Sequence, residues 1–176
     1  MSTESPVVIP VKLDEKTFRR FARFDMFALR RKWIRPLVFS LILIAFAFVA
    51  LLLGKEQSGM IAAVLLAVGI GLPLVYIGTF LSQVNMQAAR AKLKPARRVY
   101  TVTLGEAGIH VENNQKKEDP LERDWASVQR AFRKRGCIYL YVTAAKAFLL
   151  PDGQANVPDE DVWRYLETHL GKEKCR

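Results

Sequence analysis

The chain has 176 residues, of which 51% are hydrophobic, and its formal net charge is +10. The charge is uneven: residues 1–96 hold 13 basic and 5 acidic side chains, whereas residues 97–176 hold 14 and 12. No basic stripe with interleaved aromatic residues runs through the second half, which argues against nucleic acid as a partner. Isolated cysteines and histidines, two of each, argue against a metal site or another bound cofactor.

The N-terminal segment, residues 1–35, is expected to form a strand followed by a basic helix. Val7 to Leu13 is apolar enough for a short strand, although its partner is not evident. Asp14 can cap a helix that runs from Glu15 toward Trp33. Its aromatic residues recur every three or four positions, which indicates one buried face but not what buries it: the inner leaflet of a membrane or the cytoplasmic domain.

Two uncharged apolar runs, Pro36 to Gly54 and Gly59 to Leu81, make residues 36–81 a predicted transmembrane hairpin. As helices these 19 and 23 residues reach about 28 and 34 Å, against a hydrocarbon core of about 30 Å. A chain of this length is too short to bury two such helices inside a soluble protein.

Basic residues flank the hairpin on its outer sides, which predicts that both termini are cytoplasmic. Seven lie at residues 19–35 before the first span and five at residues 90–98 after the second, whereas the four-residue loop between the spans holds one. Some of these cations are candidates for contact with acidic lipid headgroups, together with a basic turn further along the chain: Arg30, Arg31, Lys32, Arg35, Arg133, Lys134 and Arg135. For the turn, an ordinary solvated hairpin tip is the simpler interpretation.

Small residues recur every four positions in the second span and predict a helix-packing face: Gly59, Ala63, Ala67 and Gly71. This face could pack against the first span, the expectation we favour because the loop is so short, or against a second copy of the chain. Neither span contains an ionisable residue, so the sequence does not mark an ion or proton path.

Residues 82–96 are predicted to continue the second helix beyond the membrane, and residues 97–176 to form a small α+β domain. Period-two alternation predicts an antiparallel hairpin at Val99–Leu104 and Ile109–Glu112, further strands near Leu121–Phe132, Cys137–Val142 and Ala147–Leu150, and then a C-terminal helix. About five strands closed by one amphipathic helix is the outline of a PH-like domain, to which Val7–Leu13 could add a strand.

The order of these parts resembles the YcxB-like family of bacterial membrane proteins. The resemblance rests on the N-terminal Phe-rich basic helix, the two-span hairpin, the segment Val99 to Val111, Trp125-Ala126-Ser127-Val128 and Phe148-Leu149-Leu150-Pro151. It implies a bacterial inner-membrane protein with a cytoplasmic PH-like domain and no catalytic residues or cofactor.

The expected function is therefore that of a non-enzymatic integral membrane protein that presents a PH-like domain to a protein or lipid partner. An enzyme would need convergent nucleophile, base or metal ligands, and the soluble part shows no such set. The alternative is a small oligomeric transport or channel component assembled through the second span.

Overall fold

The computed structural model describes residues 6–114, 119–144 and 146–176. Its chain divides into two compact units, one of residues Ala22–Ala91 and the other of the chain before and after them. The N-terminal strand belongs to the same unit as residues 97–176, the possibility that the sequence left open. The helical unit is inserted in the sequence between the first and second strands of that domain.

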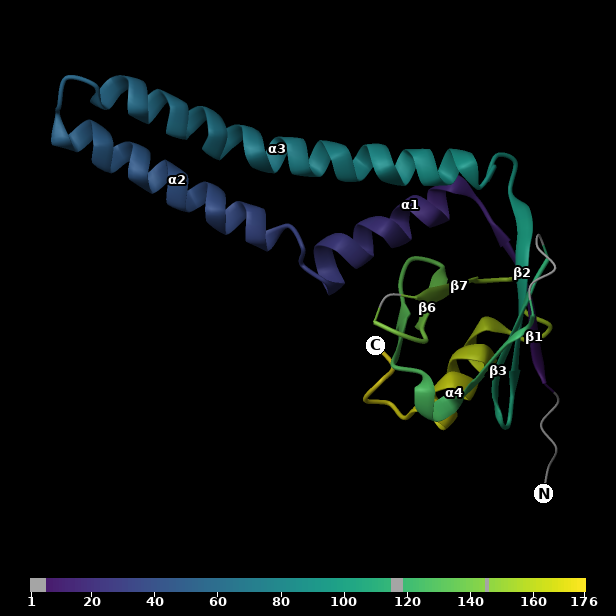
Figure 1. Ribbon diagram of the computed structural model, residues 1–176. Coiled ribbons are helices and arrows are strands. Elements are labelled where there is room, and N and C mark those ends of the chain that lie inside the picture. Colours follow the sequence, from purple (N-terminus) through teal and green to yellow (C-terminus); the bar gives the residue numbers. More distant parts are fainter. Residues whose placement is uncertain (1–5, 115–118, 145) are drawn as a thin grey trace. The chain divides into compact units, whose positions relative to one another are not determined.

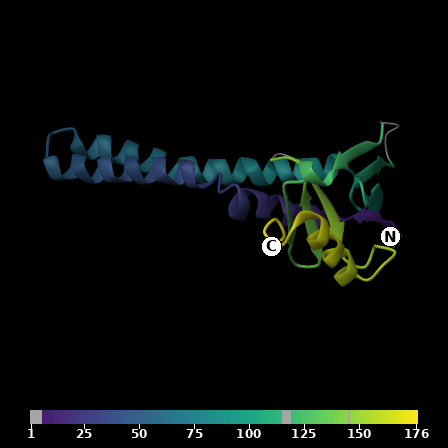
Figure 2. The same cartoon turned by 90° about the horizontal axis from the view of Figure 1, so that it is seen from below.

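The helical unit contains α2 (Ile34–Leu53) and α3 (Ser58–Arg90), two helices long and apolar enough to cross a membrane. They run side by side in Figures 1 and 2. In each, only 11% of the most apolar stretch is buried, which is unlike the core helix of a soluble protein. Leu52 and Leu74, for example, are 86% and 65% exposed. α2 ends at Gly54, whose left-handed conformation (φ 61°) suits glycine at a helix C-terminus.

The contact between α2 and α3 is made by a different set of small residues from the one predicted. Ser58, Ala62 and Gly69 are the buried small residues of α3's apolar portion. The Ser40 hydroxyl on α2 donates a hydrogen bond to the Gly69 carbonyl oxygen. A side chain at Gly69 would lie 3.2 Å from Ile44 Cγ1, so glycine permits the close approach here.

The predicted packing residues face elsewhere. Gly59, Ala63 and Ala67 are exposed and Gly71 is half-buried. A Cβ placed at Gly59 or Gly71 would have no neighbouring atom within 4 Å. The expectation that this face packs on the first span is therefore wrong, because the true contact face is rotated around the same helix.

The helix expected from Glu15 to Trp33 is interrupted. It consists of α1 (Glu15–Arg23) and a π-helical turn, η1 (Phe24–Leu29), followed by a non-helical turn before α2. Phe21 packs against Tyr139, with ring centroids 5.3 Å apart, within the domain unit. Phe27 packs against Phe80 of α3 at 6.2 Å, within the helical unit. The aromatic face is thus covered by protein at both positions.

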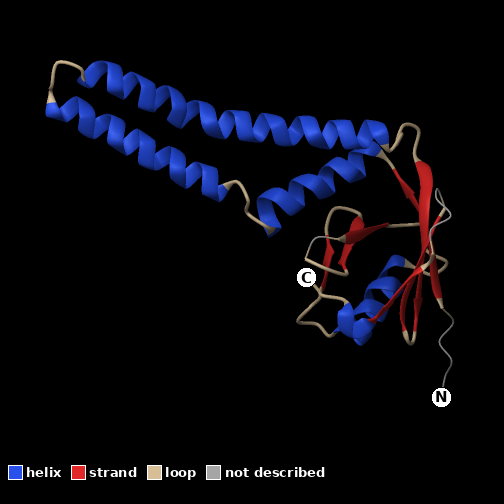
Figure 3. Cartoon of the chain, in the orientation of Figure 1, coloured by secondary structure: helices blue, strands red, loops and turns tan. Residues whose placement is uncertain are grey.

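The domain unit contains two antiparallel sheets (Figure 3). The first has the order β1 (Val7–Leu13), β2 (Arg97–Gly105), β3 (Gly108–Asn113) and β4 (Leu121–Asp124). β1 alternates buried residues with half-buried or exposed ones, as a strand with one face in the core does. Its register places Val7 opposite Leu104 and Leu13 opposite Arg97. The strand partner that the sequence left open is therefore β2.

The second sheet has the order β5 (Arg130–Arg133), β6 (Cys137–Tyr141) and β7 (Ala147–Pro151). All five residues of β6 are buried, as is typical of a central strand covered on both faces. A 3₁₀ turn, η2 (Trp125–Ser127), separates the two sheets in sequence, and α4 (Asp159–Leu170) closes the chain. Val162, Tyr165, Leu166 and Leu170 are the buried residues of α4.

Tyr100 joins the two sheets. Its hydroxyl accepts a hydrogen bond from the Leu149 N–H (2.8 Å) and donates one to the Leu149 carbonyl (3.1 Å). The Tyr100 hydroxyl thereby pairs the Leu149 N–H and carbonyl, two backbone groups that a neighbouring strand would otherwise pair. Burial raises the pKa of this hydroxyl, so it stays protonated and keeps both bonds.

Candidate functional site

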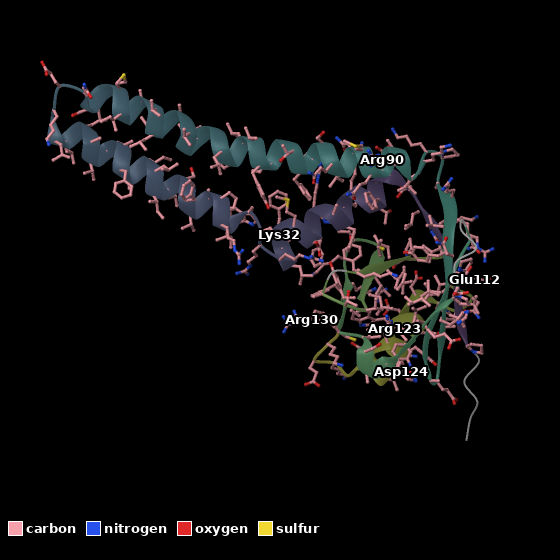
Figure 4. The ribbon with its side chains drawn as sticks, viewed as in Figure 1. Lys32, Arg90, Glu112, Arg123, Asp124 and Arg130 are labelled. Atoms are coloured by element: carbon pink, nitrogen blue, oxygen red, sulfur yellow. The ribbon has the colours of Figure 1, made fainter. Side chains whose placement is uncertain are left out.

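The predicted basic residues Arg30, Arg31, Lys32 and Arg35 lie together in the helical unit, at the turn between η1 and α2. The turn is held by backbone bonds from the Lys32 N–H to the Met26 carbonyl (3.1 Å) and from the Ile34 N–H to the Arg31 carbonyl (3.0 Å). Arg31 adopts a left-handed conformation (φ 47°), which reverses the chain before α2 begins. Figure 4 marks the turn by Lys32.

Arg30 is fixed by a nearby carboxylate. Its Nε donates to Asp25 Oδ1 at 2.9 Å, and its backbone N–H donates to the Asp25 carbonyl at the same distance. Asp25 lies one helical turn earlier in η1. The π-helical turn therefore places an acid where it neutralises one arginine of the cluster.

These basic residues line a cavity of about 480 Å³ together with Pro36 and Tyr76. A second cavity of about 230 Å³ shares Lys32 and Tyr76 with the first; its other lining residues are Asp25, Met26, Thr79, Phe80 and Gln83. The α3 residues were missed by sequence reasoning. Tyr76 was visible only as one of the few polar groups in an apolar span, and nothing local indicated that it faces the arginines.

The second predicted basic set belongs to the other unit. Arg133 forms an ion pair with Glu160 in the first turn of α4, with an Nη2–Oε1 distance of 2.8 Å. This carboxylate raises the pKa of the Arg133 guanidinium, and the guanidinium lowers the pKa of Glu160. Lys134 and Arg135 are exposed at the tip of the turn. Of the predicted three, Arg133 is thus engaged within the domain.

The described residues show no group of three His, Cys, Asp or Glu side chains that could hold a metal ion. Both thiols are buried. Burial raises the pKa of Cys137 to about 12 and that of Cys175 to about 11, which keeps them protonated and poorly nucleophilic near neutral pH. Cys175, the penultimate residue, is buried beside Ala131, with which it forms an isolated β-bridge.

His169 is part of an aromatic stack. Its ring lies 4.3 Å from Tyr165 and 4.9 Å from Trp125, and the Trp125 indole donates to the Gly105 carbonyl at 2.9 Å. These contacts fasten α4 and η2 to the first sheet's hairpin. The arrangement is that of a packing cluster in which Tyr165 is buried and Trp125 and His169 are half-buried.

Comparison with protein-family models, with curated proteins and with solved structures found no match.

Proposed function

We propose that the protein is a non-enzymatic integral membrane protein in which α2 and α3 anchor a PH-like domain at the cytoplasmic face of a bacterial inner membrane. The observation that carries this proposal is the place of the hairpin in the chain. Leu13 and Arg97 are register partners on β1 and β2, so the chain leaves the sheet and returns to it at one point. Only an even number of membrane crossings is compatible with that pairing, and α2 and α3 supply two.

The PH-like assignment is supported by two antiparallel sheets of four and three strands and one C-terminal helix. Inclusion of β1 brings the domain closer to a complete PH-like fold than residues 97–176 alone. The assignment to the YcxB-like family is part of the same proposal and rests on the order of parts and the short strand motifs.

A binding role fits the chemistry better than catalysis does. The thiols are protonated, His169 is stacked, and Arg133 and Glu160 neutralise each other. Anchoring confines the domain to a thin layer at the membrane, which raises its effective concentration toward a membrane partner and makes weak contacts sufficient.

Site-specific photocrosslinking of the full-length protein in its native membrane tests this function. A crosslinker at exposed Lys134 should capture a defined protein or lipid, whereas one at Met60, an exposed position near the loop end of α3, should not capture the same molecule. Capture of nothing but a second copy from both positions would contradict an interaction domain.

The alternative, an oligomeric transport or channel component, is favoured by one observation: the small-residue face of α3 is exposed and unused by α2. Small residues let helix backbones approach closely in a membrane. Replacement of Gly59, Ala63, Ala67 and Gly71 by leucine should then abolish an oligomer in detergent, and a monomeric wild-type protein would rule this alternative out.

A further inference from the structure

We propose that the turn before α2 forms a binding site for the phosphate headgroup of an anionic phospholipid. The inference rests on the proposed membrane insertion of α2 and α3 and goes beyond it, because it assigns a discrete, saturable site rather than a general attraction to the membrane surface.

The first argument is the charge of the cavities. The described residues that line the two cavities include four cations and a single acid, Asp25. Asp25 is paired with Arg30. The net charge of the larger cavity is therefore positive and comes from Arg31, Lys32 and Arg35. Guanidinium groups bind phosphate oxygens through two parallel hydrogen bonds, so an arginine pair beside a lysine suits a phosphodiester.

The second argument is the position of the cavity along α2. Ile34, Leu37 and Val38 are 36%, 37% and 48% exposed, so the lipid-facing apolar surface begins at the same turn that carries the cations. A ligand bound here would meet positive charge at one end and exposed apolar helix at the other. A phospholipid has this combination in one molecule, whereas a soluble anion has only the first part.

The third argument is the level of the site along the α2–α3 hairpin. The Ser40–Gly69 hydrogen bond sets the register of the two antiparallel helices. Counting seven residues back from Ser40 and seven forward from Gly69 places Trp33 level with Tyr76. Tyr76 of α3 therefore lies level with the start of α2. At this end of a membrane-spanning helix, tyrosine and tryptophan rings commonly meet lipid headgroups. The 33 residues of α3 span about 50 Å, so its last turns extend beyond this level.

The size of the cavity also fits. A volume of about 480 Å³ falls within the range of small-ligand sites, roughly 300 to 1,000 Å³. Pro36 and Tyr76 line the cavity beside the cations, and the neighbouring indole of Trp33 donates a hydrogen bond to the Phe27 carbonyl (3.2 Å).

Native mass spectrometry of the full-length protein in detergent, titrated with dioleoyl phosphatidylglycerol or dioleoyl phosphatidylcholine, tests the proposal. We expect one tightly held phosphatidylglycerol and weaker binding of the zwitterionic lipid. The double variant Arg31→Gln/Arg35→Gln should lower the affinity for phosphatidylglycerol at least about tenfold. The variant Tyr76→Leu should weaken it without any change of charge, which a diffuse electrostatic attraction would not do.

The matched control is Arg90→Gln/Lys92→Gln, which removes the same charge near the end of α3 (Figure 4 labels Arg90). It should leave the affinity within about twofold. Equal losses in the two double variants, or equal binding of the two lipids, would overturn the site. Inorganic phosphate should neither bind to the protein nor compete with phosphatidylglycerol. If phosphate does bind, and the same variants weaken its binding, a phospholipid is not the ligand of this site.

Membrane insertion is measured separately, by resistance of wild type and variants to extraction with alkaline carbonate. Variants that stay inserted but bind phosphatidylglycerol as well as wild type does would refute the lipid site alone. A wild-type protein that carbonate extracts would refute the anchoring function itself.

Discussion

Single side chains complete hydrogen bonds for backbone groups that helix or sheet pairing leaves open, such as the Gly69 carbonyl, whose partner four residues on would be Pro73. Tyr100 does so for the backbone of Leu149 on β7, and Ser40 does so for the carbonyl of Gly69 in α3. A buried polar group left without a partner costs more than an average hydrogen bond contributes. Loss of either hydroxyl should therefore destabilise the protein.

Replacement of Tyr100 by phenylalanine should lower the free energy of unfolding by about 1 to 3 kcal/mol, because it leaves the Leu149 N–H and carbonyl without their partner. Denaturant unfolding of the full-length protein in detergent, followed by near-ultraviolet circular dichroism, measures the change. Tyr76→Phe removes a hydroxyl from the other unit and serves as the control. A loss no larger than that of the control would show that Tyr100 does not link the sheets.

The buried thiols predict how stability depends on pH. Cys137 has a pKa of about 12 in the folded protein and about 9 when exposed, so folding favours its protonated form. Its contribution is fully present below pH 9 and is lost as the pH rises toward 12. Between pH 8 and about pH 10 the wild-type protein should lose about 1 kcal/mol more stability than Cys137→Ala does. Parallel pH profiles of the two proteins would contradict a buried, protonated thiol.

Helical elements in an apolar segment are easy to detect and hard to orient. α2 and α3 are apolar on every side, so the sequence identified the two helices, but the four-residue repeat of small residues selected the wrong contact face. In β2, β3 and β6, by contrast, alternation or continuous burial follows directly from the residues, and these strands lie where the sequence predicted. An amphipathic pattern fixes both the element and its inner face, whereas a uniformly apolar one fixes only the element.

At the α2–α3 contact, Gly69→Leu should destabilise the hairpin by about 1 to 3 kcal/mol, because its side chain would enter the space of Ile44, Leu43 and the Ser40 carbonyl. Gly78→Leu is the matched control, since no atom lies within 4 Å of a Cβ at Gly78. Unfolding in mixed detergent and dodecyl sulfate micelles measures both. Similar behaviour of the two variants would mean that α2 and α3 do not meet at Gly69.

For the whole molecule, the sequence predicted a two-helix hairpin and a small domain of strands with a C-terminal helix, and the structure has both. It left open the pairing of β1 with β2, because the two partners are separated by the entire hairpin and neither carries a local signal for the other. The break at η1 and the approach of Tyr76 to the basic turn were missed for the same reason: both depend on contacts between elements rather than on local periodicity.

The central claim, a hairpin that crosses the membrane twice and leaves the domain in the cytoplasm, is tested most directly by cysteine labelling in intact cells. The two native cysteines are buried, so a cysteine introduced at Gln57 in the loop or at Lys134 in the domain dominates the reaction with a membrane-impermeant maleimide. We predict that Gln57→Cys is labelled in intact cells with a permeable outer envelope, and Lys134→Cys only after the inner membrane is opened. Labelling of Lys134→Cys in intact cells, or of both positions equally, would contradict the account.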